Sequence, residues 1–341
     1  MKTSMQGKTV MVTGASAGVG RATVRAFAAQ GAQLGLIARG SEGLAEARRE
    51  VEALGGRALA LPTDVADAEA VDRAAEALER ELGPIDVWVN DAMVSVFAPI
   101  VQTTPDEFRR VTEVTYLGVV HGTLAALKRM RPRNHGTIVQ VGSALAYRSI
   151  PLQAAYCAAK HACNGFTESL RSELLHEGSA VHVTEVQLPA VNTPQFGWSR
   201  SKLPNRPQPV PPIYLPEFAA DAIVFAAQHR RREVWVAWPV LKAIVSERVA
   251  AGFVDKYLAE HGFDSQQTDE PVAADRVDNL FEALPGDHGA HGSFDNRSSS
   301  FSLELWLSKH RGALLAGAGL ALLGAGLGYR MARGSSAGFV Y

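Results

Sequence analysis

Over about the first 260 residues, short hydrophobic runs alternate with longer stretches of helical periodicity. The short runs are rich in β-branched residues and have the length of buried strands. Strands of this kind separated by helices are typical of a parallel sheet that is covered on both faces. The pattern therefore predicts a doubly wound α/β domain spanning residues 1–260.

The expected elements can be given by their residues. The candidate strands are Thr9–Thr13, Gln33–Ala38, Ala58–Pro62, Val87–Asn90, Thr137–Gly142, His182–Leu188 and Glu233–Ala237. The helical stretches between them include Arg21–Gln30, Glu42–Leu54, Ala66–Leu82, Pro105–Arg129 and Ala154–Leu175.

The composition changes after residue 260. Residues 262–300 hold eight acidic residues against two arginines, show no sustained periodicity and end in three serines. Such segments rarely bury enough apolar surface to fold by themselves. We interpret residues 261–300 as an acidic, mostly disordered linker, within which a short helix around Val277–Leu284 is an option.

Residues 301–341 form a C-terminal tail whose segment 312–329 has no charge and is flanked by basic residues. Eighteen helical residues reach about 27 Å, slightly less than a hydrocarbon core of ~30 Å. Six of the eighteen are glycine, which weakens insertion, although Gly324 and Gly328 form a helix-pairing GxxxG motif. Two interpretations stay open: a single membrane anchor, which the flanking bases favour, and a Gly/Ala-rich tail or partner-binding helix.

Composition and charge narrow the functional classes. The chain has 341 residues, 47% of them hydrophobic, and a net charge of −1, so no global charge attracts nucleic acid. Two cysteines, Cys157 and Cys163, exclude a disulfide framework, and neither they nor the histidines show metal-ligand spacing. The N-terminus lacks the apolar region of a signal peptide, so we expect synthesis in the cytosol.

A glycine-rich turn follows the first strand and opens the first helix. Glycine allows backbone and phosphate to approach closely, and a helix N-terminus offers unpaired N–H groups and partial positive charge. In this strand–turn–helix context the motif predicts a dinucleotide-binding site. Its expected binding residues are Gly14, Ser16, Gly18, Val19 and Gly20.

The second strand ends in Ala38-Arg39, where an NAD site usually carries a carboxylate for the ribose 2′-hydroxyl. Ala38 offers no such group, whereas the Arg39 guanidinium is suited to a 2′-phosphate. The residues favour NADP over NAD, with a solvent-exposed surface arginine as the alternative.

Three polar residues suggest acid–base chemistry. Tyr156 and Lys160 lie one turn apart on a predicted helix, and Ser143 ends the preceding strand. An adjacent cation favours the phenolate and makes tyrosine a better proton donor or acceptor. We expect Tyr156 to exchange a proton with a substrate oxygen that Ser143 holds.

These motifs in this order resemble the short-chain dehydrogenase/reductase family over about residues 5–240. The resemblance implies a Rossmann-like fold, a nicotinamide coenzyme, carbonyl–alcohol interconversion on a small molecule and a homo-oligomer. It also implies that Asp64 and Val65 hold the adenine edge, that Asn90 supports the central strand, and that Lys160 binds the nicotinamide ribose. The loop that contacts the carboxamide corresponds to Pro189, Val191 and Thr193, with Ala190 in place of the usual glycine.

Two departures from the family pattern concern activity. Met93 stands where the family has a glycine that lies against the coenzyme, and Thr115 stands at the fourth catalytic position, usually an asparagine. The alternative function is therefore a weakly active or inactive dinucleotide-binding protein, tethered to a membrane as a sensor or scaffold.

The loop after the carboxamide-contacting residues contains three aromatic side chains. Phe196, Trp198 and Tyr214 lie within a proline-rich segment at the position of the family's substrate-binding loop. Their aromatic side chains favour an apolar substrate. A packed lid would need the same residues. The leading prediction is an NADP(H)-dependent oxidoreductase with a cytoplasmic catalytic domain that interconverts a carbonyl and an alcohol.

Overall fold

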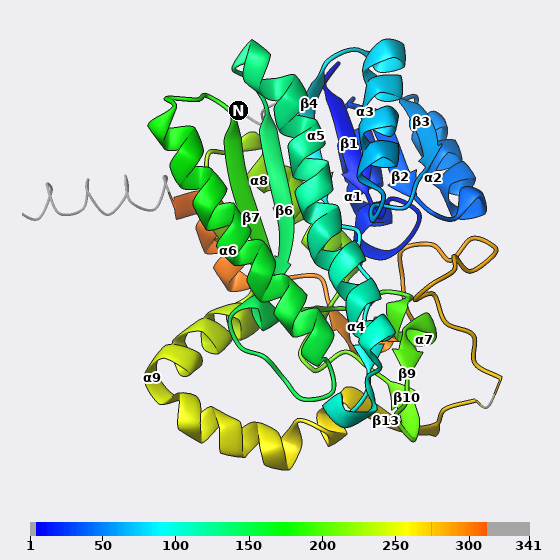
Figure 1. Cartoon of the computed structure of the whole chain (residues 1–341), viewed down its shortest axis with the longest axis vertical. Helices are drawn as coiled ribbons and strands as arrows, with labels where there is room; N and C mark the ends of the chain where they lie inside the picture. The colour runs from blue at the N-terminus through cyan, green and yellow to red at the C-terminus, as the bar shows by residue number, and fades with distance from the viewer. Residues whose placement is uncertain (1–4, 274, 312–341) are drawn as a thin grey trace, which may run out of the picture.

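A seven-stranded parallel sheet lies at the centre of the molecule (Figure 1). The computed structural model describes residues 5–273 and 275–311. The strand order is β12-β7-β6-β4-β1-β2-β3, so the winding direction changes between β1 and β4. Ligands of such sheets bind beyond the carboxyl ends of the strands at this change of direction. The strands are β1 (Thr9–Thr13), β2 (Gln33–Ala38), β3 (Arg57–Pro62), β4 (Ile85–Asn90), β6 (Thr137–Ser143), β7 (His182–Leu188) and β12 (Glu233–Trp235).

The predicted doubly wound α/β fold is confirmed. Each of the seven expected strands forms, and no strand end differs from the prediction by more than two residues. The strands of this sheet are buried on both faces near its centre, so their sequences are continuous apolar runs that are easily recognised.

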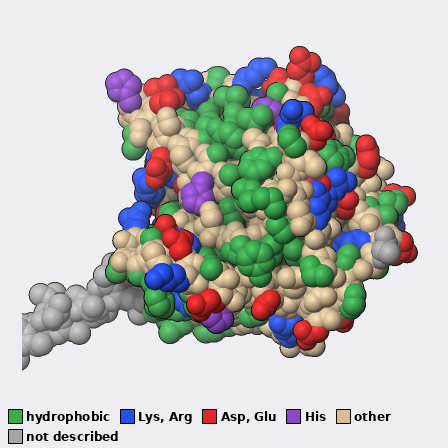
Figure 2. Space-filling view, turned by 60° about the horizontal axis from the view of Figure 1, so that its bottom comes forward, with side chains coloured by type: hydrophobic (Ala, Val, Ile, Leu, Met, Phe, Trp, Pro, Cys, Tyr) green, Lys and Arg blue, Asp and Glu red, His purple; other side chains and the backbone are tan. Residues whose placement is uncertain are grey.

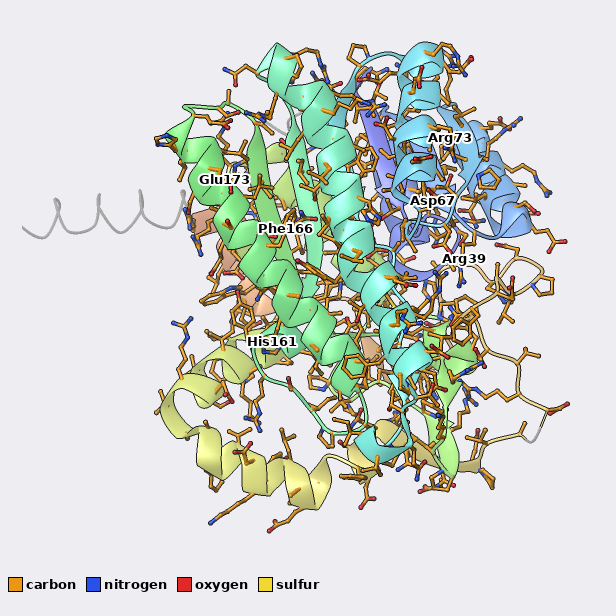
Figure 3. All side chains as sticks on the ribbon, viewed as in Figure 1. Arg39, Asp67, Arg73, His161, Phe166 and Glu173 are labelled. Atoms are coloured by element: carbon orange, nitrogen blue, oxygen red, sulfur yellow. The ribbon has the colours of Figure 1, made fainter. Side chains whose placement is uncertain are left out.

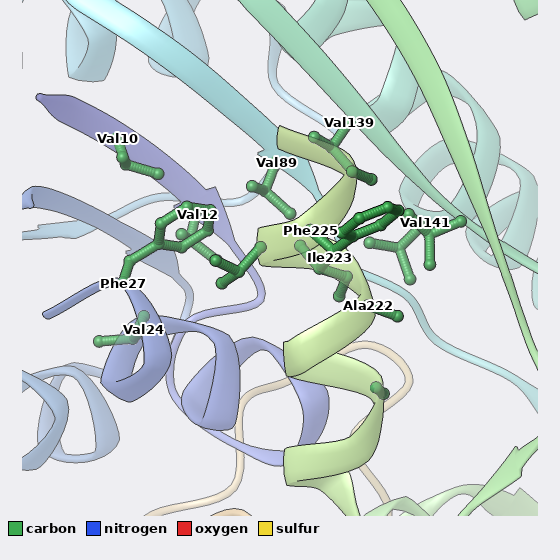
Figure 4. Close-up of a cluster of buried hydrophobic side chains, with 14 of the residues drawn as sticks. Val10, Val12, Val24, Phe27, Val89, Val139, Val141, Ala222, Ile223 and Phe225 are labelled. Carbon is green, nitrogen blue, oxygen red and sulfur yellow. The ribbon is translucent and has the colours of Figure 1, made fainter. Parts of the chain in front are cut away.

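Helices cover both faces of the sheet. On one face, α1, α2 and α8 share an apolar cluster with the strands, and Figure 4 shows its centre, where Phe27 and Phe225 lie near Val12 and Val139. On the other face, α3, α5 and α6 pack around the buried Trp88. The helices are α1 (Gly18–Ala28), α2 (Ser41–Ala53), α3 (Ala68–Leu82), α4 (Pro105–Thr112), α5 (Gly118–Arg133), α6 (Ala154–His176), α7 (Gln195–Trp198), α8 (Pro216–Gln228) and α9 (Trp238–His261).

Local signals fix several helix ends. Asp67, labelled in Figure 3, caps α3 by accepting a hydrogen bond from Ala70 N at 2.9 Å. Thr104 and Glu107 form a reciprocal capping box at the start of α4. The single helix expected over Pro105–Arg129 is instead interrupted by a π-helical segment, η2 (Glu113–Leu117).

The structure corrects the interpretation of residues 261–300 as a disordered linker. Strand β13 (Gln267–Pro271) pairs with β10 (Asn205–Pro207), and β14 (Ser298–Ser299) pairs with β11 (Ile213–Tyr214). The side chain of Leu280 is fully buried, and the chain over the expected helix is irregular, with bends at residues 280–282.

Some acidic residues of this segment pair with arginines of the α/β domain. Asp278 pairs with Arg200 at 2.9 Å, and Asp287 pairs with Arg21 at 3.1 Å. These partners are distant in sequence, so the composition of the segment alone did not reveal them.

The apolar segment 312–329 lies outside the described residues. Across residues 5–273 and 275–311, we find no helix that has both the length and the apolar character needed to cross a membrane.

Candidate active site

The glycine-rich turn connects β1 to α1 in a conformation that needs glycine. Gly14 has φ +74°, and a Cβ added there would lie 3.0 Å from Ala92 Cα. A Cβ on Gly20 would lie only 2.2 Å from Gly14 O. The turn and the start of α1 therefore pack closely at the carboxyl end of the sheet, where a helix N-terminus can bind a phosphate.

A cavity of about 1000 Å³ opens at this edge of the sheet and extends to α9. Most of the predicted site residues line it, from the turn to the catalytic helix. They are Gly14, Ser16, Gly18, Val19, Arg39, Asp64, Val65, Ser143, Tyr156, Lys160, Pro189, Val191 and Thr193. Gly20, Asn90 and Thr115 are not among the residues that line this cavity.

Ser143, Tyr156 and Lys160 lie close together in the lining of the cavity. Strand β6 ends at Ser143, which forms a hydrogen bond with the Tyr156 phenol. The Lys160 ammonium lies 5.7 Å from the centre of the Tyr156 ring and donates to Val141 O at 2.7 Å. The lysine side chain is almost fully buried, so its charge acts with little screening by solvent.

The protonation of Tyr156 is set by two opposing effects. Burial raises the pKa of the phenol above its ordinary value, while Lys160 and the hydrogen bond with Ser143 lower it. Burial outweighs the other two, which corrects the expectation that the adjacent cation would make the phenol more acidic. Tyr156 is therefore protonated at neutral pH and can serve as a proton donor.

Thr115 and Asn90 both form hydrogen bonds that stabilise the fold around the sheet. The Thr115 hydroxyl donates to Val94 O at 2.9 Å and accepts from Val94 N at 3.1 Å, so it fixes the loop after β4. Asn90 is buried, accepts from Trp88 Nε1 and donates to Gln140 Oε1, each at 2.8 Å. The side chain that hydrogen-bonds to the Tyr156 phenol is Ser143, and neither Thr115 nor Asn90 has this role.

Asp91 is a cavity residue that sequence reasoning did not select. Burial raises the pKa of its carboxyl to about 7, although Lys160 and the Gly20 N–H both act to lower it. An acidic residue directly after β4, at the change of winding direction, was the available signal in the sequence. The burial that changes its protonation depends on the tertiary structure.

The adenosine end of the predicted coenzyme site contains two arginines. Arg39, labelled in Figure 3, donates to the main-chain oxygens of Leu280 and Phe281 at 3.4 and 2.7 Å. Asp64 pairs with the guanidinium of Arg110, and Ala38 supplies no carboxylate at the end of β2. Arg39 lines the cavity at this end, and Arg110 pairs with the carboxylate of Asp64, which also lines it.

The other end of the cavity is largely apolar. Phe196, Trp198 and Tyr214 line it, as expected for a substrate-binding loop. One face of α9 also lines it, through Ala243, Ala250 and other residues spaced three or four apart.

Fold and site together define a nicotinamide-dependent oxidoreductase, and comparison with known proteins identifies the family. Residues 8–203 match the family model described as short chain dehydrogenase. The chain belongs to the short-chain dehydrogenase/reductase family, whose members interconvert alcohols and carbonyls of small molecules with NAD or NADP.

Relatives and solved structures agree with this assignment. The chain is 32% identical over 286 residues to the uncharacterized oxidoreductase YxnA of Bacillus subtilis, covering 83% of this chain and 80% of the relative. It is 29% identical over 233 residues to a fatty acyl-CoA reductase of Acinetobacter baylyi, covering 68% and 76%.

Two crystal structures share the fold. A short chain dehydrogenase from Mycobacterium paratuberculosis bound to NAD superposes with a TM-score of 0.60 at 24% identity, covering 69% of this chain and 97% of that one. An alcohol dehydrogenase from Thermococcus sibiricus, complexed with 5-hydroxy-NADP, superposes with a TM-score of 0.58 at 26% identity. The match covers 67% of this chain and 95% of that one.

Proposed function

We propose that the protein is an NADP(H)-dependent oxidoreductase that interconverts a carbonyl and an alcohol on an extended apolar molecule. The observation that carries the proposal is a partly buried Tyr156 that is hydrogen-bonded to Ser143 and lies next to the Lys160 ammonium. These groups lie in the same cavity as the glycine-rich turn. A bound coenzyme supplies or accepts the hydride, which protein side chains cannot do.

The protein's own groups handle the proton. In the reducing direction, Tyr156 gives its proton to the substrate oxygen while Ser143 holds that oxygen by a hydrogen bond. The phenolate left behind is stabilised by the nearby Lys160 ammonium. Burial favours the protonated phenol in the resting site, so the arrangement suits reduction.

Preference for NADP rests on the end of β2. Ala38 leaves no carboxylate to bind a ribose 2′-hydroxyl, and Arg39 and Arg110 provide positive charge around Asp64. An anionic 2′-phosphate would be favoured by these groups. The Thermococcus relative, complexed with 5-hydroxy-NADP, is consistent with this preference.

Preference for an extended apolar substrate rests on the cavity beyond Tyr156. Its lining continues along α9 with residues such as Ala250, Phe253 and Tyr257. Figure 2 brings the end of the molecule that carries α9 forward and shows hydrophobic side chains gathered along the middle of that face. The similarity to a fatty acyl-CoA reductase supports the same substrate chemistry.

A weakly active dinucleotide-binding protein is the second candidate. The observation in its favour is that the Thr115 hydroxyl both accepts a hydrogen bond from Val94 N and donates one to Val94 O. In addition, Met93 lines the cavity at the family's glycine position. Tethering through residues 312–329 and assembly into a homo-oligomer belong to this proposal and to the first one alike. They rest on the sequence and on family resemblance.

The first candidate is tested with long-chain aldehydes and ketones, following NADPH absorbance beside an NADH control. We expect Tyr156→Phe to lower kcat by roughly 10²–10⁴-fold while NADPH still binds, because only the proton donor is lost. Tyr116→Phe, at a tyrosine outside the cavity lining, is the matched control and should keep its activity. Full activity of Tyr156→Phe would contradict the mechanism, and binding without turnover by the wild type would favour the second candidate.

A further inference from the structure

Residues 279–289, which we call the strap, run across the coenzyme side of the cavity. In Figure 1 they belong to the gold-orange chain below α2 and beside α7. The strap begins where Arg39 binds the main-chain oxygens of Asn279, Leu280 and Phe281. The residue predicted to recognise the coenzyme is therefore held by a segment 240 to 242 positions away in sequence.

The side chain of Leu280 anchors this end of the strap. It is fully buried in the apolar cluster that also contains Ile37 and Val65, at the carboxyl ends of β2 and β3. Its main-chain oxygen also accepts from Arg110 Nε at 3.1 Å. Burying a leucine side chain contributes more free energy of attachment than a surface contact does. The strap is therefore anchored to the domain at Leu280.

The other end of the strap reaches the glycine-rich turn. Gly289 O accepts from the Gly18 N–H at 3.0 Å, and Asp287 pairs with the buried Arg21 at 3.1 Å. The strap thus spans the cavity from the expected adenosine end to the expected phosphate end.

Space remains between the strap and the turn. Ala283, Leu284 and His288 line the same cavity as Gly14 and Ser16. The strap is therefore an outer wall of the cavity. It does not fill the groove.

We propose that the strap is part of the coenzyme site: the dinucleotide lies between it and the glycine-rich turn, and the strap must lift for the coenzyme to enter or leave. This inference rests on the proposed function. It assigns a binding role to a segment that lies beyond the residues matching the family model.

A disulfide across the groove tests this directly. A Cβ on Gly40 would lie 3.9 Å from the Ala283 Cβ, within the range that disulfides span. In Gly40→Cys/Ala283→Cys, we expect oxidation after loading to slow NADPH release by roughly tenfold or more, and oxidation before loading to block uptake. Reduction should restore exchange, which is measured by displacement with unlabelled NADP in a stopped-flow instrument.

Single-cysteine controls distinguish the effect of locking the strap from other effects of the introduced thiols. The single variants Gly40→Cys and Ala283→Cys, treated with the same oxidant, account for side reactions of the buried Cys157 and Cys163. Equal exchange rates in the oxidised and reduced double variant would overturn the proposal. So would a disulfide that cannot form in loaded protein, because the strap would then compete with the coenzyme.

A second pair of variants keeps the inference testable if the double variant does not fold. Leu280→Ala removes the buried anchor and should speed NADPH release by roughly tenfold, whereas Val277→Ala, at an exposed position nearby, should not. If a folded Leu280→Ala protein releases NADPH at the wild-type rate, the proposed role of the strap is wrong, and the proposed function is unaffected. A wild-type chain that binds neither NADPH nor NADH would instead overturn the proposed function.

Discussion

Asp91 and Tyr156 show how burial decides the chemistry of single residues in this site. Lys160 lowers the pKa of both groups, yet burial raises each pKa above its ordinary value. The sequence placed the cation beside the phenol correctly through the four-residue spacing. It could not show that desolvation outweighs the cation, because burial depends on segments that approach from elsewhere in the chain.

The carboxyl of Asp91 makes coenzyme binding depend on pH. With a pKa of about 7, it is neutral below pH 7 and anionic above it, near the Gly20 N–H and the expected phosphates. We therefore expect the affinity for NADH to fall by roughly tenfold as pH rises from 5.5 to 8.5, because like charges repel. NADH is used for the titration because it lacks the 2′-phosphate, which ionises near pH 6 itself.

Asp91→Asn is the matched variant for this titration. The amide keeps the shape of the side chain but cannot ionise, so its NADH affinity should change little over the same pH range. If the variant keeps the wild-type slope, another group titrates and Asp91 is not the cause.

Arg39 tests coenzyme preference at the residue scale. Arg39→Ala removes a guanidinium suited to a 2′-phosphate, so NADPH affinity should fall by roughly 10- to 100-fold while NADH affinity changes much less. Because Arg39 also holds the strap, the ratio of the two dissociation constants is the informative measurement. An equal loss for both coenzymes would mean that Arg39 acts only through the strap.

Among the elements, the strands were the most predictable and the helix around Thr115 the least. Each strand of the sheet is a short apolar run with clear ends, so sequence alone set its limits within two residues. The periodicity over Pro105–Arg129 also continues without a break. The π-helical segment inside it coincides with the contact between Thr115 and Val94, a tertiary interaction that periodicity does not report.

This contact leads to a prediction for the element as a whole. Thr115→Val keeps the shape of the side chain but leaves the Val94 N–H and C=O without their partner inside the protein. We expect a loss of about 1–3 kcal/mol in the free energy of unfolding, measured by urea denaturation. Thr115→Ser keeps the hydroxyl and should lose less.

The comparison of the two Thr115 variants also separates structure from catalysis. If Thr115 serves only the fold, the two variants should differ in stability while kcat at low temperature stays close to wild type for both. A large fall in kcat in a stable Thr115→Val protein would restore the catalytic role expected from the sequence.

At the scale of the whole molecule, the site is assembled from parts that the sequence presents as unrelated. Residues 262–300 read as a linker from sequence because they are acidic and their hydrophobic positions show no sustained periodicity. In the structure, Asp278 and Asp287 pair with Arg200 and Arg21, and Leu280 is buried beside the sheet. Pairings across such sequence distances leave no local pattern, so this wall of the site could not have been predicted.

The same cavity joins the coenzyme site to the apolar face of α9, and this continuity gives a prediction about substrates. Each additional methylene buried along α9 is worth up to about 0.8 kcal/mol, or roughly fourfold in kcat/KM. We therefore expect kcat/KM to rise with chain length in a series of aliphatic aldehydes, until the groove is filled.

Two substitutions on α9 show whether the groove is responsible. Phe253 lines the cavity although 71% of it is exposed, whereas Val249 is 80% exposed and is not among the lining residues. Phe253→Lys should flatten the dependence on chain length and leave short substrates unaffected, because a charge in the groove opposes only the distal methylenes. Val249→Lys places the same charge on the same helix and should preserve the wild-type series. A series that is flat in the wild type, or that both variants alter equally, would mean that the chain does not lie along α9.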